Sequence, residues 1–236
     1  MPRILLSYAL QELAARTQNL VPVPSPVTAT SEAMLALDRA TRTIDGLASW
    51  SFLQRVGVAF EISANSVAAA GFVATAGDVI NVNKELKFYA AGQNFQLENV
   101  ALAEIRKKTA VWGAAMPTAF SYYLYNNAGT AVPHFYFNST IDASNKVTLQ
   151  LYYSKRMALP SSDLTTSNQI APEIPDDHSD LVIDVAVWQA KEKYNCFLSE
   201  VDKSNVLEAL QRFAREYNAS LEEIQNINDE AIRRGQ

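Results

Sequence analysis

The densest group of side chains that could do chemistry is an acidic run with one imidazole, Asp176-Asp177-His178-Ser179-Asp180, followed by Asp184 one helical turn later. Carboxylates and an imidazole can hold a divalent cation, and a metal-dependent hydrolase would need such a set. The alternative is a helix N-terminus whose acidic residues offset the macrodipole. Consecutive residues at a helix start point in different directions and rarely converge on one ion, so the sequence favours the helix start.

The remaining candidates for catalysis lack partners. His134, the only other histidine, is expected in a strand on the same face as Tyr136, with no identifiable acid or nucleophile beside it. Glu98 and Glu104 are expected on different faces of a short helix, so they do not form the paired carboxylates of acid–base catalysis. The sequence has no phosphate-binding glycine loop and no zinc-protease or serine-hydrolase signature. We therefore predict that the protein is not an enzyme and has no catalytic, cofactor-binding or metal-ligating residue.

The overall charge argues against a protein that grips nucleic acid through its phosphates. The 236 residues carry a net charge of −5, and basic residues do not cluster beyond Arg106-Lys107-Lys108. Charged residues make up 19% of the chain, below the usual share of about 25%, which hints that partners cover part of the surface. The single cysteine, Cys196, excludes an internal disulfide, and no apolar run is long enough to span a membrane. We expect a protein that stays in solution until it meets its partners.

Helical periodicity marks the N-terminal part of the chain. Apolar residues recur at helical spacing in residues 6–14, before a proline-rich connector that forbids helix. A second helix is expected to begin near Thr30 or Ser31, either of which can cap its exposed N–H groups. On this helix Asp38 and Arg42 lie one turn apart and can pair on the outer side.

The same periodicity returns in the C-terminal part. After the acidic run, apolar residues line up in residues 181–189, and a further helix holds residues 206–217. Ser220-Leu221-Glu222-Glu223 matches a capping box, so a helix is expected to begin or restart at Ser220. Neither pair of helices can bury its apolar stripes alone, which predicts one core made from both ends of the chain.

The middle of the chain has the period of strands. Between about Arg55 and Arg156, alternating apolar residues and turn signals predict a β-rich module with one short helical piece, residues 100–108. A loop rich in Ser, Thr and Pro then crosses back over residues 159–175. The expected strands are Val58–Ile62, Phe72–Asn81, Leu86–Tyr89, Phe120–Tyr125, Pro133–Phe137 and Val147–Tyr153.

These patterns predict an α+β fold. Residues 1–54 and 174–236 are expected to form a discontinuous, antiparallel helical bundle with a C-terminal arm. Residues 55–173 are expected to form the inserted sandwich-like or barrel-like module together with the crossing loop. Adjacent aromatic residues in this module point to both faces of a strand, so they either fill a core or present one face to a partner.

Four segments in order carry a resemblance to a known family. Residues 35–52, with Leu37-Asp38-Arg39, end the first helix pair, and residues 98–108 are followed by Gly113 and Met116-Pro117. Val147–Tyr153 is the strand before the crossing loop, and residues 174–182 form an acidic, proline-led start to a third helix that continues through residues 190–194. Together they resemble the head-to-tail adaptor, or tail tubular protein A-type, proteins of podoviruses over nearly the whole chain. Where that family has a Pro-Pro-x-Tyr/Trp pattern, this chain has Pro175-Asp176-Asp177-His178.

The resemblance implies a structural role in the virion for a protein made in the host cytoplasm. It implies a ring of about twelve subunits between the portal protein and the tail nozzle. Double-stranded DNA would pass through this ring without specific binding. The helical bundle would surround the DNA channel, and the β-rich module would meet the tail nozzle and tail fibre proteins. Another connector, a tail-completion subunit or a host-surface-binding tail subunit is the alternative within phage proteins.

Two sets of residues are implied in these contacts. The C-terminal arm from about Asn218 to Gln236 would dock on the portal, and one side of the β-rich module would face the tail. The residues expected in the arm contact are Leu221, Ile224, Ile227, Ile232, Arg233 and Arg234. Those expected on the tail-facing side are Tyr122, Tyr123, Tyr125 and His134.

Overall fold

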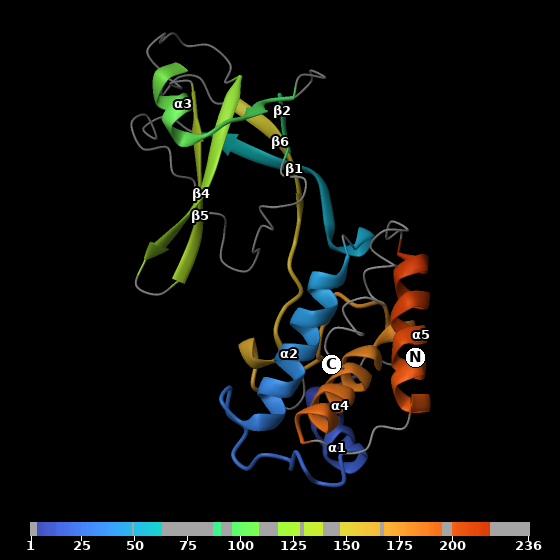
Figure 1. Cartoon of the computed structure of the whole chain (residues 1–236). Helices are drawn as coiled ribbons and strands as arrows, with labels where there is room; N and C mark the ends of the chain where they lie inside the picture. The colour runs from blue at the N-terminus through green and yellow to red at the C-terminus, as the bar shows by residue number, and fades with distance from the viewer. Residues whose placement is uncertain are drawn as a thin grey trace. The chain divides into compact units, whose positions relative to one another are not determined.

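The computed structural model confirms a mixed α+β chain (Figure 1). It divides into two compact units, which we call the helical unit (Met1–Leu53 with Met157–Gln236) and the β-rich unit (Gln54–Arg156). The residues that the structure describes are 4–48, 50–62, 87–90, 96–108, 118–127, 130–138, 147–165, 168–194 and 200–217.

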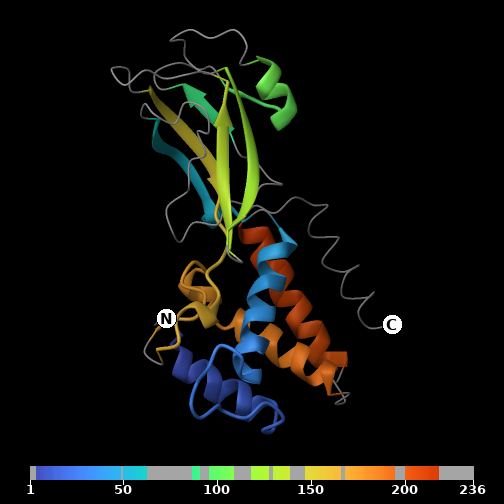
Figure 2. The ribbon, with the colours of Figure 1, turned by 90° about the vertical axis from the view of Figure 1, so that its left-hand side faces the viewer.

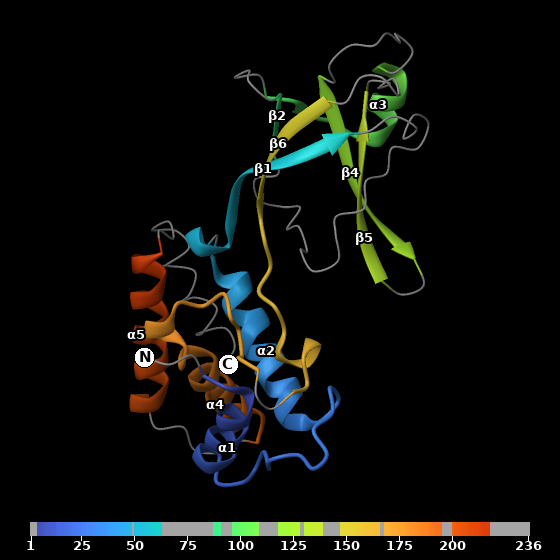
Figure 3. The ribbon, with the colours of Figure 1, turned by 180° about the vertical axis from the view of Figure 1, so that it is seen from behind.

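Four α-helices lie among the described residues of the helical unit, two from each end of the chain. They are α1 (Leu6–Arg16), α2 (Glu32–Leu47), α4 (Leu181–Lys193) and α5 (Glu200–Glu216). Figure 3 shows them from the side opposite to Figure 1. Their apolar residues join one buried core, because the pair of helices from each end leaves apolar surface that the other pair covers. The antiparallel arrangement of a bundle stays a prediction.

Helix α4 is the central helix of this unit and contacts α1, α2 and α5. A helix covered on every side needs apolar residues all round rather than one stripe. The sequence of α4 fits this position, because apolar side chains are buried around its whole circumference. The buried residues are Leu181, Val182, Ile183, Val185, Ala186, Val187, Trp188 and Ala190.

At the start of α2, a residue occupies the cap position without capping the helix. Ser31 does occupy the cap position, but its side chain caps no N–H group of the helix and donates instead to the carbonyl of Thr28. At the other end Trp50 is buried and its Nε1–H donates to the carbonyl of Ile44 over 2.8 Å. The short 3₁₀ helix η1 (Ser51–Leu53) follows, and here the chain turns from α2 into β1.

The crossing segment after the strands packs on the helical unit. The N–H of Leu6 donates to the carbonyl of Asn168 over 2.6 Å, and the N–H of Ile170 donates to the carbonyl of Ile4 over 3.1 Å. Met157 also joins the helical core. The described part of residues 157–173, which the sequence pattern groups with the β-rich module, thus supplies buried side chains to the helical core.

In the part of the chain that the structure describes, the β-rich unit contains two three-stranded sheets (Figure 2). In one sheet the order is β1 (Gln54–Ile62), β6 (Val147–Ser154) and β2 (Lys87–Ala90), with β6 antiparallel to both neighbours. The other has the order β3 (Glu98–Asn99), β4 (Ala119–Asn127) and β5 (Thr130–Phe137). Here β3 is parallel and β5 antiparallel to β4.

Aromatic rings link the two sheets. The ring of Phe88 on β2 lies 4.9 Å from that of Phe120 on β4 and 5.2 Å from that of Phe137 on β5. Edge-on contacts of this kind let three rings fill one core without a void. A sandwich or barrel stays a prediction, and the expected strand Phe72–Asn81 lies outside the described residues.

One short helix, α3 (Leu102–Lys108), lies among the strands, close to where it is expected. In the part of the chain that the structure describes, no helix is long and apolar enough to cross a membrane.

Candidate interaction site on the helical unit

The acidic run lies at the start of α4. Asp176–His178 form a 3₁₀ turn, η3, and Asp180 occupies the cap position of the helix, which confirms the predicted helix start. Nε2 of His178 lies 2.6 Å from Oε2 of Glu216 on α5. Its ring also packs against Phe213, with 5.0 Å between ring centres. The imidazole therefore fastens the start of α4 to the end of α5.

The neighbouring acids do not converge. Asp184, one turn into α4, pairs with Arg16 of α1, with 2.7 Å between Oδ1 and the guanidinium nitrogen. Among the described residues, no group of three or more His, Cys, Asp and Glu side chains could hold a metal ion. The acidic run is thus divided between a helix start, a contact with α5 and an ion pair with α1.

The glutamate pair is separated by secondary structure. Glu98 lies in strand β3 and Glu104 in helix α3, and both are exposed. The expectation that both lie on one short helix was wrong, because the helix begins only at Leu102 after the two-residue strand that pairs with β4.

The four positions expected to face the tail lie in one hairpin, β4–β5. In the register of β4 and β5, Tyr123 is opposite His134 and Tyr122 is opposite Phe135, while Tyr125 is opposite Val132. The hairpin therefore brings together the four positions expected to face the tail, and that role stays a prediction. The positions expected in the portal-binding arm, Leu221, Ile224, Ile227, Ile232, Arg233 and Arg234, lie outside the described residues.

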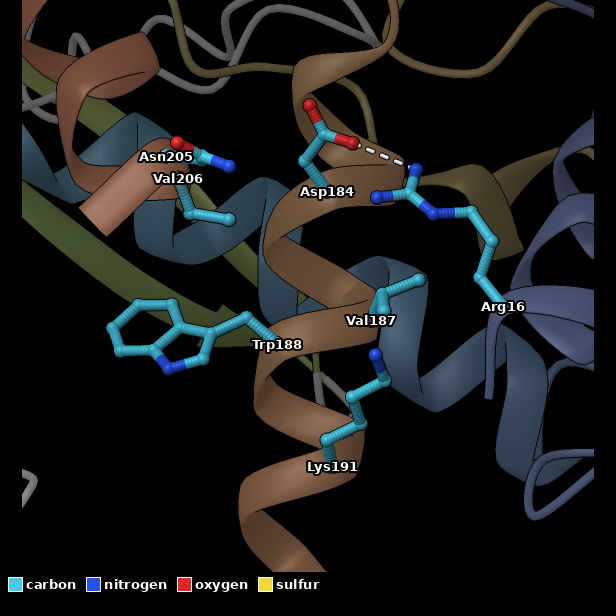
Figure 4. A pocket seen from close by; sticks show the side chains of 7 residues that line it. All are labelled: Arg16, Asp184, Val187, Trp188, Lys191, Asn205 and Val206. Atoms are coloured by element: carbon cyan, nitrogen blue, oxygen red, sulfur yellow. Dashed lines mark hydrogen bonds and ion pairs between the residues drawn. The ribbon is translucent and has the colours of Figure 1, made fainter. Parts of the chain in front are cut away.

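A small cavity, the α4–α5 pocket, lies beside the Arg16–Asp184 ion pair (Figure 4). Its apolar lining comes from α4 and α5, and its rim carries Arg16 and Lys191. The lining residues are Arg16, Asp184, Val187, Trp188, Lys191, Asn205 and Val206. The cavity has a volume of about 150 Å³, below the roughly 300–1,000 Å³ of pockets that bind small molecules. It has the size for one side chain of a partner rather than for a substrate.

An open groove, the α2–α4 groove, follows the other side of α4. It is lined by Arg39, Arg42, Thr43, Gln189, Glu192 and Lys193. Three cations face one acid in this lining. Lys193 is engaged with Glu32, whereas no ion pair of Arg39 or Arg42 is recorded among the described residues. Both arginines are exposed.

The wall of the groove contains a buried acceptor. Nε2 of Gln189 donates to Oγ1 of Thr43 over 2.8 Å, and that hydroxyl in turn donates to the carbonyl of Arg39. Because the hydroxyl proton of Thr43 is already used, the amide of Gln189 must present its nitrogen there. Its Oε1 is left buried, with no donor among the described residues. Such an atom is costly unless a partner or water donates to it.

A polar cluster closes one end of the groove. Lys193 and Tyr194, at the end of α4, both donate to Oε1 of Glu32 at the start of α2. The hydrogen bond from Lys193, followed by that from Tyr194, lowers the pKa of Glu32. The bond to Glu32 raises the pKa of Lys193 and the pKa of Tyr194. The cluster holds the two helices that form the groove.

These features suit recognition of a protein rather than catalysis. Arginine beside exposed apolar residues is typical of protein interfaces, and Leu35 on α2 is 40% exposed in the same stripe as Arg39 and Arg42. Sequence patterns did not predict this groove, because its residues come from two helices far apart in the chain. The available signal was the spacing of Leu35, Arg39 and Arg42, which places all three on one face of a helix.

The comparisons with known proteins agree with this character. The family model described as SU10 adaptor protein matches residues 8–235, which span both units. No curated protein matches the chain.

Proposed function

Because the chain belongs to the SU10 adaptor protein family, a family of phage head-to-tail adaptors, we propose that it forms a ring between the portal and the tail nozzle of a short-tailed phage. The family is structural, so the protein is a component of the virion and not an enzyme. Its place in the neck implies association with portal and tail components. The match over residues 8–235 is the observation that carries the proposal.

In the proposed ring, about twelve copies surround the channel through which the DNA leaves the head. The helical unit encircles the channel, and the β-rich unit, with Tyr122, Tyr123, Tyr125 and His134, faces the tail nozzle or fibres. The net charge of −5 per copy supports a channel that DNA passes without adsorbing, since like charges repel. The C-terminal arm from Asn218 docks on the portal.

The test is assembly on the portal protein of the same phage. Purified protein is mixed with the portal and followed by sedimentation velocity and negative-stain imaging. We expect a discrete ring on one face of the portal. A folded protein that leaves the portal unchanged would overturn the portal contact.

A second experiment tests the arm. A chain ending at Tyr217 is expected to keep its helical circular dichroism and lose portal binding. Replacement of Leu221, Ile224 and Ile227 by serine in the full chain is expected to do the same, because an arm docks through its apolar face. If both variants bind as the wild type does, the contact lies elsewhere.

A further inference from the structure

The helical unit carries opposite charges on two of its surfaces. On α2, Arg39 and Arg42 are three residues apart and exposed along the α2–α4 groove. At the start of α4, Asp177 and Asp180 are also three residues apart and exposed, and we call this pair the acidic edge. No ion pair of these four residues is recorded in the described part of the chain. Each surface therefore keeps exposed charges that can pair with a second molecule, although the charge of Arg39 also helps to lower the pKa of Glu32.

The two surfaces lie on different sides of the central helix. The groove is formed where α2 packs on α4. The acidic edge belongs to the turn whose His178 is bound to Glu216 and Phe213 of α5. A protein with complementary patches on different sides associates head to tail, so that each copy uses its groove for one neighbour and its edge for the other.

We infer that the α2–α4 groove binds the acidic edge of a second copy of this chain, so that Asp177 and Asp180 of one subunit pair with Arg39 and Arg42 of the next. The inference rests on the proposed ring and names its joint. Guanidinium groups hold carboxylates through two parallel hydrogen bonds, and Arg39 and Arg42, three residues apart on α2, are close enough for two such pairs to form side by side.

The stripe of α2 that carries the two arginines is not purely charged. The exposed Leu35 adds apolar contact at the edge of the joint.

The experiment reverses the charges of each surface in the full chain and measures ring assembly on the portal. The R39E/R42E variant has an acidic groove and an acidic edge, and the D177R/D180R variant has both basic. For each variant alone, the protein concentration required for ring assembly is expected to rise by at least about tenfold, because like charges meet at every joint. A 1:1 mixture is expected to restore assembly, since acidic grooves then meet basic edges and basic grooves meet acidic edges.

The K203E/R212E variant is the matched control for R39E/R42E, because it makes the same change of net charge on α5 at positions that belong to neither the α2–α4 groove nor the acidic edge. It is expected to assemble as the wild type does. The neutral R39Q/R42Q variant gives a second measure: it should weaken assembly and reduce its dependence on salt.

The outcomes separate the joint from the adaptor role. If the wild type forms a ring and the reversed variants form it equally well, the joint is wrong and the adaptor role stands. If R39E/R42E fails alone and in the mixture while remaining folded, the groove meets the portal or DNA instead of a second copy, and the inference is overturned. If the wild type adds no ring to the portal, the proposed function fails, and the joint fails with it.

Discussion

At the scale of single residues, Asp38 shows why spacing alone misleads. The sequence predicts an exposed pair of Asp38 and Arg42, one turn apart on α2. In the structure Asp38 is only 8% exposed and accepts hydrogen bonds from the N–H and the hydroxyl of Ser161. Helical spacing identifies neighbours on one helix, but it does not show which face a loop from residues 157–165 will cover. The predicted exposed pair was therefore wrong.

We expect Asp38→Ala to lower the free energy of unfolding by about 1–3 kcal/mol, because two donors of Ser161 lose their acceptor. Arg42→Ala is the control, since Arg42 is exposed and should change stability by less than about 0.5 kcal/mol. Urea denaturation of both variants measures the difference. If both variants lose the same free energy of unfolding, the result favours the exposed Asp38–Arg42 pair that the spacing predicts.

Glu32 makes stability depend on pH. Its pKa in the folded chain is lower than the ordinary value of 4.5, so its contribution is present above that value and is lost as pH falls through the folded pKa. Compared with Glu32→Gln, the wild type should be more stable at pH 7 by about 0.2–1 kcal/mol, the range of exposed ion pairs. The difference should shrink below pH 4.5. Unfolding curves of the wild type and of Glu32→Gln across the acid range measure this difference.

The alkaline side of the same cluster has the opposite sign. The pKa values of Lys193 and Tyr194 are raised above 10.5 and 10.0 by their bonds to Glu32. Their contribution is present below those ordinary values and is lost as pH rises through the folded ones. Tyr194→Phe should therefore flatten the loss of stability above pH 10.0. If Tyr194→Phe loses stability with rising pH as steeply as the wild type does, the hydroxyl of Tyr194 does not contribute to the stability of the cluster.

At the scale of elements, helical period located the four helices of the helical unit, and the strand period located β1, β2, β4, β5 and β6. Both periods reflect burial on one face, which is local information. The two-residue strand β3 escaped because it has too few residues to show a period. The α2–α4 groove and the His178–Glu216 contact also escaped, because each joins segments whose pairing depends on the whole core.

Helix α5 is held mainly by an aromatic cluster. Phe213 is fully buried, with its ring centre 4.8 Å from that of Trp50 and 5.0 Å from those of His178 and Tyr217. Phe213→Ala should lower the free energy of unfolding by about 3–5 kcal/mol, because the cavity removes contacts from every neighbour. Arg212→Ala, one residue away and exposed, should cost less than about 0.5 kcal/mol. Thermal and urea denaturation compare them, and a loss below about 1 kcal/mol for Phe213→Ala would show that the end of α5 packs loosely.

At the scale of the whole molecule, both ends of the chain meet in one core. All the buried residues of the helical core come from residues 4–53 and 157–214. Sequence patterns could predict this union, because four amphipathic or apolar helices have no other way to hide their surfaces. They could not assign the crossing segment, since its few apolar residues show no period.

The last prediction follows from this core. A chain in which a Gly/Ser linker replaces Gln54–Arg156 is expected to fold and unfold cooperatively, because the linker removes none of the core residues of the helical unit. Deletion of residues 1–53 is the control: it strips α1 and α2 from α4, whose apolar surface extends all round, and should leave a chain that binds hydrophobic dyes without a cooperative transition. Circular dichroism in urea, with the near-ultraviolet signal of Trp188, which both chains retain, distinguishes the two. If the linker chain also melts without cooperativity, the β-rich unit supplies stability that the helical core lacks, and the two units fold as one.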